Sequence, residues 1–148
     1  MKVSTKGRYG LRALVDLTVY SKENHVSLIS IAERQNISSN YLEQVFAALR
    51  KAGIVKSIKG SKGGYILADK PENITVAQII KVLEGDFNIV DELHDVNAEK
   101  DNIQLAIQSL VWERVNIEVD NIFNSVTLED LANEYKNLNV NMGVMYYI

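Results

Sequence analysis

Cysteine is absent from this 148-residue chain, which excludes disulfide bonds, thiol nucleophiles and thiolate ligands for zinc or iron–sulfur clusters. Proline occurs once, at Pro71, and no run is dominated by glycine, serine or proline, so we expect little disorder. No stretch approaches the about 20 apolar residues of a membrane span, and the N-terminus lacks the apolar core of a signal peptide. With 47% hydrophobic residues, the chain is expected to be a soluble, cytoplasmic, mostly helical protein of one or two small domains.

Charge is divided unevenly along the chain, although its net value is only −3. Residues 1–70 carry 12 Lys/Arg against 5 Asp/Glu, a net of +7, whereas residues 71–148 carry 4 against 14, a net of −10. Such a division predicts that the first half binds nucleic acid and that the second half has another role. The alternative is that solvated surfaces of the two halves differ in sign by chance.

Residues 27–67 have the pattern of a winged helix-turn-helix. After a first helix over residues 9–20, Ser27 is a plausible N-cap for a second helix, which a turn at 36–38 ends before a third helix over 39–51. Two strand-like segments then flank a basic, glycine-rich tip at 59–64. An exposed helix beside a basic hairpin is typical of proteins that grip the major groove and the flanking backbone of DNA. A phosphate-binding loop is disfavoured, because its spacing is absent and no helix follows the tip.

The third helix has one apolar face, expected to pack inward, and one polar face that can approach base edges. Asparagine and glutamine can bond adenine bidentately, and glutamate can accept from the cytosine amino group. The residues of this helix expected at the DNA are Ser39, Asn40, Glu43, Gln44, Arg50 and Lys51. Backbone contacts are expected from Lys2, Ser4, Thr5, Lys6 and Arg8 before it and from Lys56, Lys59, Ser61 and Lys62 in the hairpin. For the N-terminal residues the alternative is that their side chains are simply solvated and do not contact DNA.

The sequence pattern of residues 71–148 predicts a helix through which two copies of the chain associate. A fourth helix is expected from Thr75 to Gly85, followed by an acidic connector over 86–99 and a long helix over about 101–124. This long helix is apolar on more than one side, so we expect one side to pack within its own subunit and another to pack on a second copy. The residues assigned to dimerisation are Ile103, Ile107, Leu110, Val111, Trp112, Val115, Val119 and Ile122. Burial of both sides within one chain is the alternative.

The chain ends in a predicted capping box at 127–130, a short final helix and a tail over 137–148. We therefore divide it into a winged helix-turn-helix domain, 1–85, and a region of connector, dimerisation helix and tail, 86–148. The expected fold class is mainly α with a small β-hairpin wing. No enzyme is predicted, because His25 and His94 have no nucleophile or metal partner near them in sequence.

Several segments together resemble the Rrf2 family of bacterial winged-helix transcription regulators. They are STKGRYG at 4–10, YLEQ at 41–44, LRKAG at 49–53, GGY at 63–65, LEG at 83–85 and TLEDL at 127–131. The resemblance implies a homodimer whose long helices cross and whose two winged helices bind a palindromic DNA operator. It also implies that Asn40, Tyr41, Glu43 and Gln44 face the major groove and that Lys59 enters the minor groove.

Many members of that family hold an iron–sulfur cluster through three cysteines before the dimerisation helix, but residues 92–106 contain none. Asp91, Glu92, His94 and Asp95 can in principle bind a divalent cation, although a solvated acidic loop is the simpler interpretation. We therefore predict no metal and no cofactor. The chain instead resembles the cluster-free branch of the family, which includes repressors of cysteine metabolism.

The C-terminal residues 145–148 resemble those of cluster-free repressors that partner the cysteine synthase CysK. That enzyme accepts peptides ending in isoleucine, so the resemblance implies partner binding through Tyr146, Tyr147 and Ile148. The alternative is that these side chains pack on the dimer. The predicted function is repression of cysteine or sulfur metabolism genes. The other candidates are a regulator of a metabolic enzyme with secondary DNA binding, and a family regulator of another pathway that senses a small metabolite.

Overall fold

The computed structural model describes residues 2–22, 24–90 and 101–146, with side chains up to residue 143. Helix α1 (Thr5–Tyr20) begins four residues before the predicted start at Tyr9. Its N-cap is Ser4, whose hydroxyl accepts a hydrogen bond from the backbone N–H of Gly7 at 3.3 Å. The two glycines of its first turns let α1 approach α4 (Val76–Glu84) closely, since a Cβ on Gly10 would lie 2.3 Å from Leu83 Cδ1. The predicted start was wrong because these glycines weaken the local helix signal while favouring the packing.

Helices α2 (Leu28–Gln35) and α3 (Ser39–Lys51) have the predicted bounds. Ser27 and Ser38 cap them, accepting hydrogen bonds from Ser30 N at 3.2 Å and Tyr41 N at 3.4 Å. Between the helices Asn36 adopts a left-handed conformation with φ 53°, which asparagine tolerates better than most residues, and the next side chain, Ile37, is buried. The predicted helix-turn-helix is therefore confirmed.

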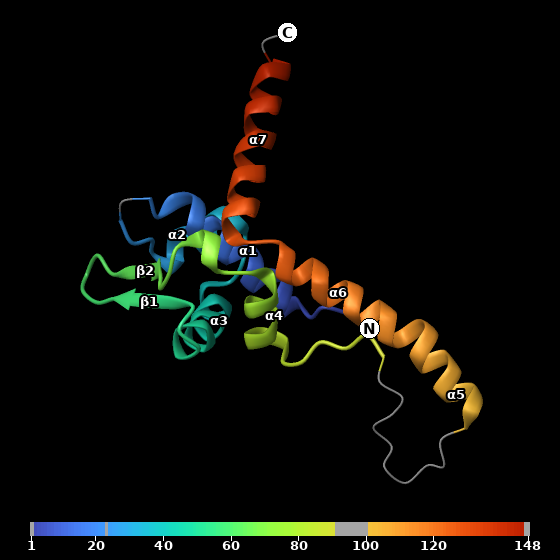
Figure 1. The fold of residues 1–148 in the computed structure, drawn as a ribbon. Helices are drawn as coiled ribbons and strands as arrows, with labels where there is room; N and C mark the ends of the chain where they lie inside the picture. The colour runs from blue at the N-terminus through green and yellow to red at the C-terminus, as the bar shows by residue number, and fades with distance from the viewer. Residues whose placement is uncertain (1, 23, 91–100, 147–148) are drawn as a thin grey trace.

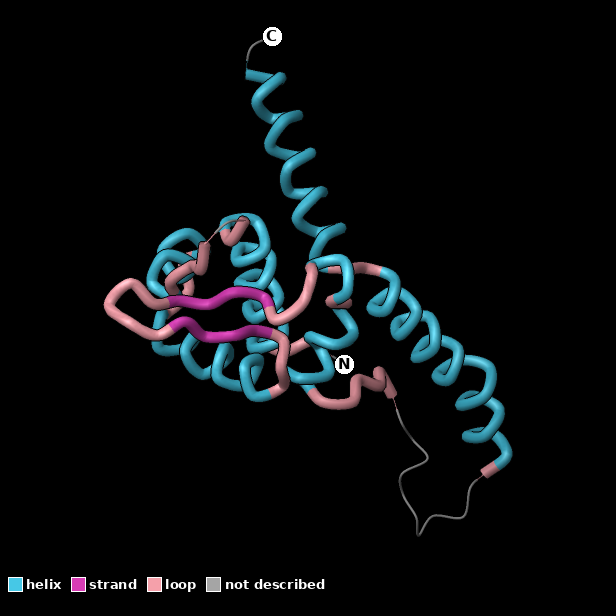
Figure 2. The backbone as a smooth tube through the Cα atoms, turned by 60° about the vertical axis from the view of Figure 1, so that its left-hand side comes forward, coloured by secondary structure: helices cyan, strands magenta, loops and turns pink. Residues whose placement is uncertain are grey.

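Strands β1 (Val55–Ile58) and β2 (Gly64–Leu67) form the antiparallel wing, with Val55 opposite Leu67. The segment before α2 joins this hairpin, because Val26 and Tyr65 exchange two backbone hydrogen bonds of 2.9 and 2.8 Å. Gly64 makes this approach possible, since a Cβ there would lie 2.4 Å from the carbonyl oxygen of Val26. The wing is thus tied to the body of the domain (Figure 2).

The second half contains the short helix η1 (Pro71–Asn73) and α4, then α5 (Asn102–Ile107), η3 (Gln108–Trp112), α6 (Glu113–Ser125) and α7 (Leu128–Tyr146). The predicted long helix corresponds to α5, η3 and α6 in succession, with η3 a π-helical turn that the sequence pattern does not reveal. The predicted capping box is present: Asp130 N donates to the Thr127 hydroxyl at 3.1 Å, and Thr127 N donates to the Asp130 carboxylate at 3.0 Å.

The final helix is longer than predicted, because residues 137–146, expected as a tail, continue α7. Once its capped first turn packs on α1 through Leu128 and Ala132, each added residue completes one further backbone hydrogen bond. Glycine has a poor helix propensity, but α7 continues through Gly143 to Tyr146.

The hydrophobic core lies within α1 to α4, β1 and the first turn of α7. Its buried residues are Ala13, Leu14, Leu17, Val26, Ile31, Ala32, Ile37, Leu42, Val45, Phe46, Leu49, Val55, Ile74, Ile79, Leu83 and Leu128. The α5–α6 rod and the far half of α7 project from this body in different directions (Figure 1). The mainly helical winged fold predicted from the sequence is confirmed.

Candidate DNA-binding interface

Helix α3 separates its side chains as the helical spacing predicts. Leu42, Val45, Phe46 and Leu49 are buried, while Asn40, Glu43, Gln44, Arg50 and Lys51 are exposed on the opposite side. Ser39 is also exposed, at the first position of the helix. The uncovered side is therefore polar and open to base edges, and the DNA contacts assigned to its single residues stay predictions.

An ion pair between a buried carboxylate on α1 and a partly exposed guanidinium on α2 links the helix-turn-helix to α1. Asp16 is only 3% exposed, and its carboxylate accepts hydrogen bonds from Arg34 Nη2 at 2.7 Å and Arg34 Nε at 2.9 Å. Gln35 Nε2 adds a further bond to Asp16 at 2.9 Å. The hydrogen bonds to Asp16 raise the pKa of the Arg34 guanidinium above its ordinary value, so the arginine stays charged. These bonds link the end of α2 to α1.

The basic N-terminus lies beside the start of α3. The rings of Tyr9 and Tyr41 meet edge to face with centroids 6.0 Å apart, which leaves Tyr41 half-buried. The guanidinium groups of Arg8 and Arg12 lie 6.0 and 5.3 Å from the Tyr9 ring centroid. The sequence interpretation missed Arg12, although it is exposed and follows Arg8 by one helical turn. Its Nη2 also donates to the carbonyl of Gln35 at 2.7 Å, so it touches the helix-turn-helix directly.

The other N-terminal candidates differ in how much of their side chain is available. Lys2 and Lys6 are exposed. Ser4 caps α1 and its N–H donates to Glu84 at 2.8 Å, while its hydroxyl also bonds Glu84. The Thr5 hydroxyl accepts from Arg8 at 3.4 Å. Ser4 therefore holds the N-terminus on α4, and its predicted phosphate contact stays a prediction.

The wing presents Lys56 on strand β1 and Lys59, Ser61 and Lys62 at its tip, all exposed. Gly60, with φ 123°, occupies a conformation that side chains rarely adopt, and its carbonyl accepts from Gly63 N at 3.0 Å. His25, an isolated loop histidine in the sequence, is hydrogen-bonded through Nε2 to the carbonyl of Lys62. It therefore braces the tip, a role that only the tertiary contact reveals.

The predicted dimerisation residues are mostly uncovered in a single chain. Ile103 and Leu110 are 68% and 66% exposed, Trp112 and Val119 are half-buried, and Ile107, Val111, Val115 and Ile122 are exposed. Leu105 and Ile117, which were not predicted, are exposed as well. We call these exposed apolar side chains the exposed row of the α5–α6 rod. So many of them close together are typical of a surface that another protein covers.

A family model described as "Iron-dependent Transcriptional regulator", Rrf2, matches residues 3–134. The chain belongs to the Rrf2 family. One similar protein is the HTH-type transcriptional regulator CymR of Bacillus subtilis (strain 168), which is 45% identical over 89% of this chain and 90% of its own length. The solved structure of B. subtilis CymR, "the Global Cysteine Regulator", has a TM-score of 0.79 and covers 90% of this chain and 98% of that one. That of T. potens IscR has a TM-score of 0.78 at 42% identity, over 99% and 97%.

An Rrf2 protein without cysteine does not fit the iron chemistry in the family description. In the middle of the long helix the amide oxygen of Gln108 and the indole N–H of Trp112 are buried without a hydrogen-bond partner among the described residues, and neither group can replace a thiolate as an iron ligand. Asp91, Glu92, His94 and Asp95, the candidate cation ligands, lie outside the described residues. Elsewhere, in residues 2–22, 24–90 and 101–146, no group of three or more His, Asp or Glu side chains is placed to hold a metal ion.

Two further sequence predictions concern the C-terminal residues and the lack of a membrane span. Tyr146 is the last residue of α7, and Tyr147 and Ile148 lie outside the described residues. Among the helices that the structure describes, none is both long enough and apolar enough to cross a bilayer.

Proposed function

We propose that this DNA-binding transcription regulator is a cytoplasmic homodimer that represses cysteine or sulfur metabolism genes from a palindromic operator. The observation that carries the proposal is the exposed polar side of α3 next to the braced basic wing. The similarity to a global cysteine regulator supports the choice of pathway. Base edges would be met by α3 and phosphates by the wing and the N-terminus.

The division between base and phosphate contacts gives a direct test. Gln44→Ala should remove about 1–3 kcal/mol of discrimination at one base pair, because a bidentate base contact is lost. Lys62→Ala should weaken binding to all duplexes alike and reduce the salt slope by about 1. Anisotropy titrations of palindromic promoter duplexes at two salt concentrations measure both effects. Lys81→Ala, which removes the same charge from an exposed position of α4, is the control and should change neither. Uniform weakening by Gln44→Ala would show that the base-reading side of α3 is misassigned.

The exposed apolar row of the α5–α6 rod supports the dimer. Leu110→Glu should convert the dimer to monomer in sedimentation equilibrium, because it places a charge among side chains that a second copy would cover. Trp112, the single tryptophan, lies two residues away, and its emission should shift to longer wavelength as water reaches it. Asn121→Glu, at an exposed polar position of α6, is the matched control. A dimer that survives Leu110→Glu would place the interface elsewhere.

We also propose that the C-terminal residues bind a cysteine synthase. Helix α7 projects from the winged-helix body and ends at Tyr146, the first of the residues assigned to this partner (Figure 1). An apolar terminal side chain beside a carboxylate suits capture by a site built for a small carboxylate substrate. Deleting Ile148 should abolish synthase binding in calorimetry, whereas Asn137→Ala on exposed α7 should leave it intact. Equal affinity of the two variants would remove this partner from the proposal.

A further inference from the structure

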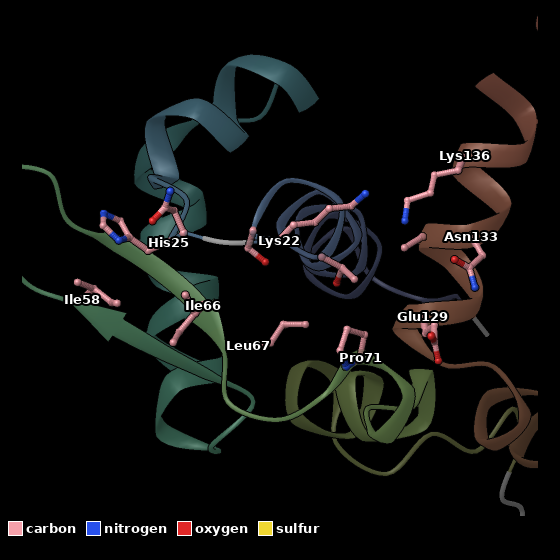
Figure 3. Close-up of a pocket in the computed structure, with 13 residues that line it drawn as sticks. Lys22, His25, Ile58, Ile66, Leu67, Pro71, Glu129, Asn133 and Lys136 are labelled. Atoms are coloured by element: carbon pink, nitrogen blue, oxygen red, sulfur yellow. The ribbon is translucent and has the colours of Figure 1, made fainter. Parts of the chain in front are cut away.

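A groove of about 610 Å³ lies behind the wing, between the end of α1, strand β2 and the start of α7 (Figure 3). Its volume is within the range of sites that hold small organic molecules. Leu67, Pro71 and Ile66 form an apolar side of the groove, and Lys22, Asn133 and Lys136 supply polar groups. It is separate from the exposed side of α3 and from the exposed row of the α5–α6 rod.

Two ammonium groups define the charge of this groove. Lys22 lies in the loop that follows α1 and Lys136 lies on α7, and Figure 3 shows the two side chains pointing toward each other across the opening. Among the described residues, which do not include Glu23 next to Lys22, no carboxylate lies within 4.0 Å of either ammonium. Two like charges that face one another are mutually destabilising, and an anion placed between them relieves that repulsion.

Glu129 limits the charge of the anion. It lies in the same groove, seven residues or about two helical turns before Lys136 on α7, and below the two lysines in Figure 3. A second carboxylate on the ligand would approach this side chain and be repelled. The apolar side formed by Leu67 and Pro71 suits a hydrocarbon portion instead. We propose that this groove binds a small organic monocarboxylate, with its carboxylate between Lys22 and Lys136 and its apolar part against Leu67 and Pro71.

The groove is connected to the wing by bonds already described. The loop that carries Lys22 continues to His25, which bonds the Lys62 carbonyl, and to Val26, which exchanges two hydrogen bonds with Tyr65. A ligand that bridges this loop and α7 would hold the wing in one position relative to the body. Because the wing would already be ordered, less conformational entropy would be lost when DNA binds. The ligand should therefore strengthen operator binding. This consequence rests on the proposed DNA-binding function, whereas the site itself does not.

The first test uses hexanoate as the probe and hexanamide, its uncharged analogue, as the control. In amide-resolved NMR titrations hexanoate should shift residues 21–26, 66–67 and 132–136, and hexanamide should bind about tenfold more weakly. Lys22→Ala and Lys136→Ala should each weaken hexanoate binding about tenfold, while Lys81→Ala should not. Equal shifts from both probes, or hexanoate shifts confined to other residues, would overturn the site.

The second test adds operator DNA to the same proteins. Both lysine variants should keep the operator affinity of the unmodified protein without hexanoate and lose its strengthening by hexanoate. If no duplex is bound sequence-specifically while the NMR shifts are as expected, the proposed function fails and the site stands. If the operator is bound but hexanoate produces no localised shifts, the site fails and the function stands.

Discussion

Arg34→Met should lower the free energy of unfolding by about 3–5 kcal/mol, because it leaves the Asp16 carboxylate buried without its cation. The side chain of Asp16 is fully buried and that of Arg34 is 31% exposed, so water can solvate the arginine far better than the aspartate. After the substitution Gln35 alone would still donate to this carboxylate, at 2.9 Å. Urea unfolding followed by circular dichroism, at one fixed protein concentration since a dimer is expected, measures the loss.

Two further variants separate the ion pair from the packing around it. Arg50→Met removes an exposed arginine from α3 and should change stability by at most about 0.5 kcal/mol. The double variant Asp16→Leu with Arg34→Met replaces both charges by apolar groups and should recover most of the loss. A loss of under about 1 kcal/mol for Arg34→Met would mean that the pair behaves as a surface contact, and that α2 is oriented by its apolar side chains alone.

The elements that could be predicted from the sequence are those whose signals are local. Ser27, Ser38 and Thr75 each cap the helix that follows, and the bounds of α2 and α3 match the expected ones. Gly60 at the wing tip and Gly85 at the end of α4 are also local signals. Both adopt a positive φ that other residues avoid, so they predict turns at these positions. The polar side of α3 followed from the same 3.6-residue spacing that placed Phe46 inside.

The elements that could not be predicted depend on contacts between distant residues. The early start of α1 is supported by Ser4 with Glu84, which lie 80 positions apart. The tether of the wing depends on Val26 meeting Tyr65, and the role of His25 depends on the carbonyl of Lys62. The extension of α7 through asparagine-rich residues 137–146 follows from its packed first turn rather than from their own propensity. The groove behind the wing was missed because its two lysines, one in the loop after α1 and one on α7, are 114 residues apart in the sequence.

Phe46→Ala should also cost about 3–5 kcal/mol of stability, because the side chain is fully buried at the junction of α3 and the wing. Its ring meets that of Tyr65 on β2 with centroids 5.0 Å apart and an angle of 65°, so the substitution opens a cavity where the two elements join. Urea unfolding measures the loss. Phe46→Leu, which keeps most of the volume, should cost less than about 1.5 kcal/mol.

The pair of rings connects stability to DNA recognition. A double-mutant cycle of Phe46→Leu with Tyr65→Leu should give a coupling of about 0.5–1.5 kcal/mol beyond the separate losses. Tyr65 also carries the backbone bonds to Val26, so a wing freed from α3 would retain that tether and move about it. Operator affinity of the folded Phe46→Leu protein should then fall alike for all duplexes, since the wing meets phosphates rather than bases. A coupling near zero would show that the wing is positioned by the Val26 tether alone, and that α3 and the wing bind DNA independently.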